Sequence, residues 1–461
     1  MKKILLNILV VFAMPAMVMA QTFQLPNYTS FTLPNGLVVN LMEQHDVPVI
    51  ALSVILPAGS IYDGEKSGLA SLTADALKLG TKNYSKTQLD EALDFVGANI
   101  NAYASKEYAL LNAKFASKDK ENILNIVKDI LLYPTFDEAE FEKEKSRALV
   151  GIERQKESPR SIIQSYFDVL VYGNHVYGNI PQGTAATLSA LTTSDLRAFY
   201  TKNYVPNGSA LSVVGDFSSK DMKKTITKLF SEWKKSSGTT ANLASLALPD
   251  LSESRVLLVN KDDAKESTFY IGSQGISRNN PDFVDISIIN TLFGGRFTSM
   301  LNDELRVNSG LTYGARSQFN ALKYGGSFNI STFTANETTE AALDKTFEVI
   351  NALHAKGLDE ASLTSAKNYV KGQFPPKYET VSQLSGLLSD MFWYDLDKSY
   401  INNFQKKVDE LDLKKANEII KTYFPKENFQ VVLIGKASEI KEIAKKYGKV
   451  IETEINTYPK R

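Results

Sequence analysis

The chain has 461 residues, no cysteine and only three histidines, and its 52 Lys and Arg residues balance its 52 Asp and Glu residues. This length allows roughly two to four domains, each with a core of its own. The lack of cysteine excludes disulfides, iron–sulfur clusters, thiol catalysis and cysteine-ligated zinc. A net charge of zero provides no overall positive field, so we expect no nucleic-acid partner.

The first 20 residues, MKKILLNILVVFAMPAMVMA, have the pattern of a secretory signal peptide. Two lysines precede an apolar stretch over residues 4–17, and residues 18–20 provide a cleavage site with small residues. We therefore expect cleavage after Ala20 and a mature protein in the periplasm. The alternative is a membrane anchor, but the apolar stretch is shorter than the roughly 20 residues that a span needs. No later segment is apolar enough, so the mature chain is expected to have no membrane span.

The predicted elements of the first half follow one another closely along the chain. A Ser-Lys-Thr-Gln sequence at 85–88 is a capping box for the next helix, and Gly97 is its stop signal. Gly80 is expected at the C′ position of the preceding helix. The predicted order is a strand, turn and strand over 31–44, a strand at 49–59, helices at 68–81 and 89–97, a hairpin formed by 100–105 and 108–115, and helices at 119–132 and 138–155.

The second half repeats this order of strands and helices. The two kinds of element mix without a regular β-α-β alternation, which predicts an α+β fold with largely antiparallel sheets. The predicted elements are a strand at 267–276, helices at 281–293 and 298–307, strands near 312–320 and 325–334, and helices at 337–356 and 359–373.

A sequence repeat supports two homologous halves. Residues 196–217 and 416–437 each run from a helix, through a Tyr and a Pro, to an apolar strand that ends in Gly215 or Gly435. Such a repeat predicts a duplicated unit.

The boundary between the halves is expected in residues 236–252, which are rich in Ser, Thr, Ala and Gly and low in charge. We therefore place the N-terminal domain at 22–235 and the C-terminal domain at 253–461.

The residues by themselves do not identify an enzyme. The chain has no G-x-S-x-G, P-loop or G-x-G-x-x-G motif. His45, His175 and His354 lie far apart in the sequence, and none has a His or carboxylate partner at helical i, i+4 spacing. We interpret all three as loop or surface residues. The carboxylates of residues 135–145 alternate with lysines, which is typical of a solvated helix.

The order of several segments resembles the insulinase/pitrilysin-type zinc metallopeptidases over nearly the whole mature chain. The resemblance implies two homologous peptidase-like α/β domains, each a largely antiparallel sheet covered by helices, which together enclose a chamber for peptides. The segments are Asn35-Gly36-Leu37, VILPAGSIYDGEKSGLASLTADALKLGT at 54–81, GANINAYASKEY at 97–108, YGNHVYGNIPQGT at 172–184, NYVPNGSALSVVGDF at 203–217 and LFGGRFTSMLNDELRVNSGLTYG at 292–314.

The family's zinc motif is absent from this chain. In active members a helical His-x-x-Glu-His presents two imidazoles one turn apart to Zn²⁺, the Glu acts as general base, and a Glu on a later helix is the third ligand. The aligned positions here are Ser71, Ala74 and Asp75, and the later ligand falls at Gly151. Glu153 is two residues out of phase, about 200° around a helix. We therefore expect no metal site in this chain.

Two other parts of the family's machinery are present. Asn101 and Ala102 lie in the strand that binds an extended peptide by β-augmentation in the family, although Ala104 replaces a Thr. Arg306 and Tyr313 match a second-domain pair that reaches the zinc site in active relatives. Their chemistry suits that task, because Arg donates charge-assisted hydrogen bonds and Tyr can donate to an oxyanion. The alternative is a surface Arg and a Tyr packed in the core.

Three functional hypotheses remain open. The first is a non-catalytic subunit that binds peptide and contributes Arg306 and Tyr313 to the zinc site of a His-x-x-Glu-His partner. In this hypothesis the zinc is expected in the partner and no cofactor in this chain. The second is a peptide-binding or scaffold protein without a proteolytic role. The third is a self-sufficient peptidase with an atypical metal site.

Overall fold

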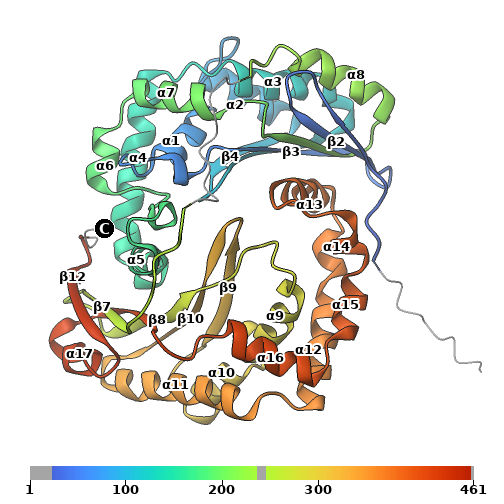
Figure 1. Cartoon of the computed structure of the whole chain (residues 1–461). Coiled ribbons are helices and arrows are strands. Elements are labelled where there is room, and N and C mark those ends of the chain that lie inside the picture. Colours follow the sequence, from blue (N-terminus) through green and yellow to red (C-terminus); the bar gives the residue numbers. More distant parts are fainter. Residues whose placement is uncertain (1–22, 236–245, 458–461) are drawn as a thin grey trace, which may run out of the picture.

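The computed structural model describes residues 23–235 and 246–457, in two halves whose sheets face each other (Figure 1). The strand orders are β1-β2-β6-β3-β5-β4 and β12-β7-β11-β8-β10-β9, so five strands of each half correspond. The edge strands differ, since β1 is antiparallel to β2 and β12 is parallel to β7. The expected signal peptide at 1–20, with its cleavage site, and residues 236–245 of the expected linker lie outside the described residues. No helix in the described ranges is long and apolar enough to cross a membrane.

The first sheet is mixed, with β2 and β6 parallel and its other neighbouring pairs antiparallel. Its strands are β1 (Thr29–Thr32), β2 (Val38–Glu43), β3 (Val49–Leu56), β4 (Asn99–Ala104), β5 (Ala109–Ala116) and β6 (Ala210–Gly215). The helices of this half are α1 (Leu69–Ala76), α2 (Lys86–Val96), α3 (Lys120–Leu132), α4 (Glu138–Lys156), α5 (Pro159–Tyr172), α6 (Ala185–Ala190), α7 (Thr193–Asn203) and α8 (Ser219–Phe230).

The second sheet is also mixed, with β7 parallel to both β11 and β12. Its strands are β7 (Arg255–Asn260), β8 (Glu266–Gln274), β9 (Arg316–Leu322), β10 (Gly325–Ala335), β11 (Gln430–Gly435) and β12 (Lys449–Glu454). The helices are α9 (Phe283–Asn290), α10 (Met300–Asn302), α11 (Thr339–Lys356), α12 (Glu360–Gln373), α13 (Val381–Trp393), α14 (Lys398–Asn402), α15 (Phe404–Glu410), α16 (Leu413–Tyr423) and α17 (Ala437–Ala444), with π-helical turns at Thr291–Gly295 and Asp303–Asn308.

The α+β prediction is confirmed, and several local signals act as expected. Ser85 and Gln88 form the capping box of α2, and Gly97 ends that helix with a φ of 65°. The prediction for Gly80 is wrong. α1 ends earlier, with Leu77 as its C-cap, and Gly80 instead forms an isolated antiparallel bridge with Ser85. The helix expected at 298–307 is a short α10 followed by a π-helical turn.

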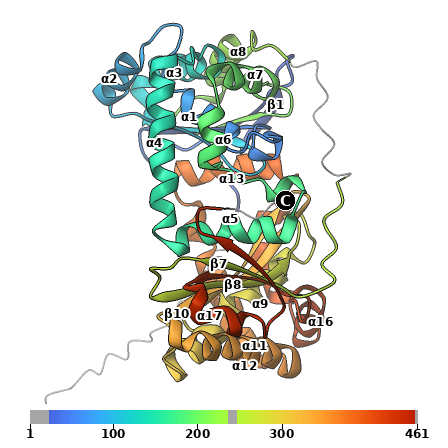
Figure 2. The ribbon, with the colours of Figure 1, turned by 90° about the vertical axis from the view of Figure 1, so that its left-hand side faces the viewer.

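The two halves exchange one helix each. α5 follows the helices of the first half but packs on β8 and β11 of the second sheet, whereas α13 packs on β3 and β6 of the first sheet. Figure 1 shows both helices in the space between the two sheets, and Figure 2 shows α4 leading down from the first half into α5. Each sheet is therefore covered on its inner face by a helix from the other half of the chain.

Two hairpin turns also meet across the halves. The buried Glu107 carboxylate, between β4 and β5, accepts two hydrogen bonds from the Lys323 backbone N–H, at 2.9 and 3.1 Å. It also accepts one from the Tyr177 hydroxyl, whose oxygen in turn accepts from the Tyr324 N–H at 3.1 Å. Burial raises the pKa of Glu107, and these hydrogen bonds oppose that shift. The contacts hold the inner ends of the two sheets at one relative position.

Gly215 and Gly435, which end the repeated strands, have different neighbours. Replacing them should therefore lower the free energy of unfolding by different amounts. Gly215 has a φ of 142°, and an added Cβ would lie 2.2 Å from the Val49 carbonyl oxygen. At Gly435 the nearest atom would be the mobile Cδ1 of Ile440, at 2.9 Å. We expect Gly215→Ala to lower the free energy of unfolding by about 3 kcal/mol or more, and Gly435→Ala by about 1 kcal/mol or less. Urea denaturation of both variants tests this, and equal losses would contradict it.

Candidate functional site

The helix that carries the zinc motif in active relatives, α1, is well formed here. The Asp63 carboxylate accepts hydrogen bonds from the backbone N–H groups of Gly68, at 3.0 Å, and Ala70, at 2.8 Å, which stabilises the helix start. Leu69, Leu72 and the other apolar residues of α1 lie in the core of the first half. The scaffold for the motif is thus retained without its ligands.

The motif positions lie on the opposite side of α1 from that core. Ser71 donates a hydrogen bond from its Oγ to the Pro181 carbonyl at 2.7 Å, and Ala74 is fully buried. Asp75 is half-buried, and burial, together with repulsion from Glu144, raises its pKa to about 6. A carboxylate in this position lacks the two imidazoles and the second carboxylate that would hold zinc.

α4 faces this side of α1 with a glycine where a ligand would lie. Gly151 and Glu144 are seven residues apart, so they share one face of α4, and Glu144 is close enough to Asp75 to affect its charge. A Cβ added at Gly151 would meet no atom within 4 Å. Glu153 lies on another face and pairs with Lys156 at 2.7 Å. In the described ranges, no three His, Asp or Glu side chains are grouped so that they could hold a metal ion.

Asp75 should make the stability of the chain depend on pH. Because its pKa is raised to about 6, the folded chain binds the proton more tightly than the unfolded chain does. Stability therefore falls as the pH rises from about 4 to about 6, and the loss persists above that range. We expect Asp75→Asn to raise the free energy of unfolding by roughly 2–3 kcal/mol at pH 8, with no gain at pH 4. Urea denaturation at both pH values tests this. Asp94→Asn, at an exposed position of α2, is the control, and a gain independent of pH would contradict the prediction.

The predicted peptide-binding strand lies at the edge of the first sheet. Among the residues that the structure describes, β4 pairs with β5 alone, so the other side of its backbone has no partner strand. The Ala102 side chain is buried in the core, whereas Asn101 is exposed on the other face, so Ala102 can offer a peptide only its backbone. Lys78 donates to the Ile100 carbonyl at 3.1 Å. This edge has the form that β-augmentation requires.

Arg306 and Tyr313 both lie at the surface of the second half. Arg306 is on the π-helical turn Asp303–Asn308, with its guanidinium 4.7 Å from the centre of the Phe297 ring. Tyr313 precedes β9 and is 81% exposed, with its ring stacked on Phe333 at 6.4 Å. The alternative of a Tyr packed in the core is therefore wrong. Across the described ranges, no hydrogen bond holds the Tyr313 hydroxyl in place.

Sequence reasoning missed two arginines beside Tyr313. A cavity of about 520 Å³ on the inner face of the second sheet is lined by Tyr313 together with Arg316 of β9 and Arg160 of α5. The Arg160 guanidinium lies 3.3 Å from the centre of the Phe333 ring and pairs with Glu266 at 3.0 Å. Arg160 comes from the first half and arrives here only through the exchange of α5, so no local sequence signal could have placed it.

The three histidines take no part in these sites. The exposed His45 lies between Asp216, at 2.8 Å, and Glu43, at 3.2 Å, and hydrogen bonds to both raise its pKa. His175 caps a short turn, and His354 is on α11 near the Pro425 carbonyl. Partial burial lowers the pKa of both of these imidazoles.

Comparison with known proteins agrees with this arrangement. Residues 38–180 match the model of the insulinase family (peptidase family M16), and residues 190–370 match the model described as peptidase M16 inactive domain. The chain belongs to the insulinase family. It is a member without the His-x-x-Glu-His motif, as the resemblance in the sequence indicated.

Relatives of this insulinase-family chain are described in two ways. A Bacillus subtilis protein described as an uncharacterized zinc protease, YmxG, is 24% identical over 88% of this chain and 97% of its own length. A Helicobacter pylori protein described as a non-peptidase homologue is 22% identical over 79% of this chain and 84% of its own length.

Solved structures share the fold. A crystal structure of a peptidase M16 inactive domain from Pseudomonas fluorescens has a TM-score of 0.83 at 24% identity and covers 89% of this chain and 98% of that one. A protease from Helicobacter pylori has the same TM-score at 22% identity, over 89% of this chain and all of that one.

Proposed function

We propose that this chain is the non-catalytic subunit of a periplasmic zinc peptidase and works with a partner that carries His-x-x-Glu-His. The observation that carries the proposal is the contrast between its two halves. The zinc positions hold Ser71, Asp75 and Gly151 in place of the ligands, whereas Tyr313 is exposed and its hydroxyl has no hydrogen-bond partner in residues 23–235 and 246–457. An exposed aromatic residue with a free donor is suited to contact a molecule outside the chain.

In this proposal each group of the chain has a separate task. Asn101 and Ala102 on the open edge of β4 bind an extended peptide through backbone hydrogen bonds. Arg306 and Tyr313 donate hydrogen bonds to the oxygen that becomes negative at the scissile bond. The zinc belongs to the partner and supplies the activated water. The inactive-domain match over 190–370 supports a role that needs a second subunit.

The experiment is to co-express this chain with a His-x-x-Glu-His homologue from the same organism. We expect the two to co-purify, to contain zinc in the partner, and to hydrolyse a fluorogenic peptide that neither chain cleaves alone. A scaffold role predicts that this chain leaves the partner's hydrolysis unchanged. A self-sufficient peptidase predicts that this chain cleaves the peptide alone and loses that activity with a chelator. Either result would overturn the proposal.

A further inference from the structure

A row of polar side chains crosses the inner face of the first sheet. The residues are direct cross-strand neighbours, since Asn40 of β2 pairs with Ser212 of β6, Ser212 with Ser53 of β3, Ser53 with Asn112 of β5, and Asn112 with Asn101 of β4. Ser53 and Ser212 are fully buried. A polar row is unusual in the interior of a sheet, where apolar side chains provide most of the packing.

The second sheet is an internal comparison for this row. Val432 occupies the place of Ser212 in the sequence repeat, and its neighbours in the same register are Leu257 and Tyr270. Large side chains of α5, among them Tyr166 and Phe167, pack against these residues in one apolar cluster. The same location is therefore filled with apolar side chains in one half and is polar in the other.

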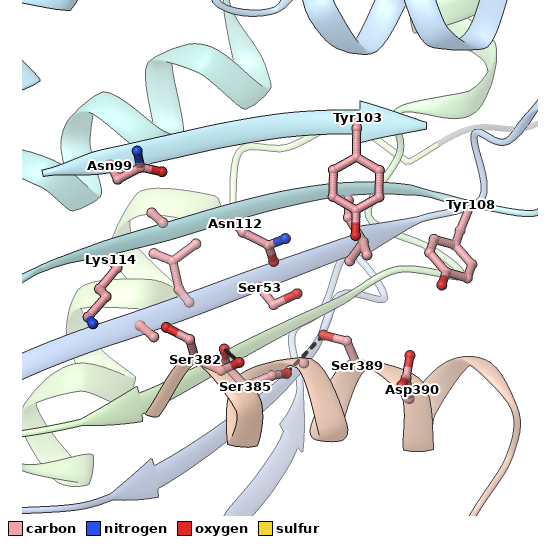
Figure 3. Close-up of a pocket in the computed structure, with 15 residues that line it drawn as sticks. Ser53, Asn99, Tyr103, Tyr108, Asn112, Lys114, Ser382, Ser385, Ser389 and Asp390 are labelled. Atoms are coloured by element: carbon pink, nitrogen blue, oxygen red, sulfur yellow. Dashed lines mark hydrogen bonds between the residues drawn. The ribbon is translucent and has the colours of Figure 1, made fainter. Parts of the chain in front are cut away.

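The helix over the polar row carries small side chains. α13 presents Ser382, Ser385, Gly386 and Ser389 to the first sheet, and a cavity of about 520 Å³ remains between them (Figure 3). A Cβ added at Gly386 would meet no atom within 4 Å. The Ser385 and Ser389 hydroxyls donate to the carbonyls of Ser382 and Ser385, which leaves their oxygens able to accept.

One group in the cavity wall is left without a partner. The Oγ of Ser53 is buried and makes no hydrogen bond within the described chain, although Ser53 lines the cavity. Leaving a buried hydroxyl unpaired costs about 1–3 kcal/mol. This cost is removed when a molecule in the cavity supplies the missing hydrogen bond.

The two ends of the cavity have opposite charges. Lys114 lies at one end and Asp390 at the other, with the Ser and Asn side chains between them (Figure 3). Neither side chain forms an ion pair within the described residues. The nine residues of α13 from Ser382 to Asp390 span about 12 Å, and three extended peptide residues span about 10–11 Å. The charges and the length thus match a short peptide with free termini.

We propose that this cavity binds a free tripeptide or tetrapeptide, with its carboxylate at Lys114 and its ammonium group at Asp390. Ser53 and Asn112 of the polar row and the Ser hydroxyls of α13, which line the cavity, bind the peptide backbone. Because a cavity of about 520 Å³ has to hold the peptide backbone and both termini, peptides of alanine, glycine and serine are preferred. The inference concerns this chain by itself and does not depend on a zinc-bearing partner.

Isothermal titration calorimetry of the purified chain with trialanine tests the proposal. The titration is run at pH 8, because burial raises the pKa of Asp390 to about 6, against the opposing charge of Arg278. We expect saturable binding of one trialanine per chain, and at least tenfold weaker binding of N-acetyl-trialanine amide, which has no charged termini. No binding of trialanine, or equal binding of the capped peptide, would overturn the proposal.

Variants separate binding from folding. Gly386→Leu fills the cavity and should abolish binding, whereas Gly372→Leu, at an exposed position of α12, makes the same change elsewhere and should leave binding intact.

The charged ends of the cavity are tested one at a time. Lys114→Met and Asp390→Asn should each weaken binding about tenfold, with exposed Lys118→Met as the control. Ser53→Ala should weaken binding severalfold without lowering Tm, because it removes an unpaired hydroxyl. A Gly386→Leu variant that still binds trialanine normally would refute the site.

Discussion

Arg306→Ala should lower the kcat/KM of the assembled pair for peptide by about 100- to 1000-fold, and Tyr313→Phe should have an effect in the same range. Each substitution removes donors that act on charge developing at the reacting carbonyl. The loss should therefore be found mainly in kcat, with little change in KM. Steady-state kinetics of the co-purified pair, with the amount of each subunit measured by gel filtration, gives both values.

The controls for this experiment make the same chemical change at another place, or a conservative change at the same place. Tyr369 is also exposed, at 43%, and Tyr369→Phe removes a hydroxyl outside the proposed site. Arg306→Lys keeps the charge but loses the planar fork of donors, so it should recover only part of the activity. If both Arg306→Ala and Tyr313→Phe leave hydrolysis unchanged while the pair stays assembled, these residues do not act on the partner's zinc site.

Restoring the lost ligands should give this chain a zinc site of its own. The triple variant Ser71→His, Asp75→His and Gly151→Glu places two imidazoles one turn apart on α1 and a carboxylate on the facing side of α4. Gly151 has open space around it, and Ser71 and Asp75 are partly exposed, so the new side chains have room. We expect about one zinc per chain after dialysis, as three protein ligands and a water complete a tetrahedral site.

The matched control for this variant is the double substitution of Ser71 and Asp75 by His. In the double variant Glu144 is the carboxylate that α4 presents on this face, and it is already paired with Arg147 at 2.6 Å. We expect markedly weaker zinc binding and a smaller rise in Tm with added zinc. Free zinc at 100 times the Kd of the new site should raise the free energy of unfolding of the triple variant by about 2.7 kcal/mol. Equal zinc contents in the double and triple variants would show that the α1–α4 geometry differs from the one described here.

Local sequence signals determined much of the fold, because they act over a few residues. The capping box of Ser85 and Gln88, the stop at Gly97 and the alternation in β4 and β5 all depend on neighbours within one turn or one hairpin. The repeat around Gly215 and Gly435 predicted the duplicated halves. The absence of ligands at Ser71, Ala74, Asp75 and Gly151 was also readable, since it requires only an alignment of residue types. The C′ position predicted for Gly80 was wrong, because a glycine that follows a helix fits several turn conformations.

Tertiary structure decided which surfaces meet. α5 is buried along most of its length, yet its sequence does not say which sheet covers it. Only the folded chain places α5 on the second sheet and α13 on the first. For the same reason Arg160 reaches Tyr313, and Glu107 accepts from Lys323, across more than 150 residues of sequence. The polar row through Ser53 depends on the register of five strands. Such contacts are set by long-range packing, whose energy is shared among distant residues and leaves no local pattern.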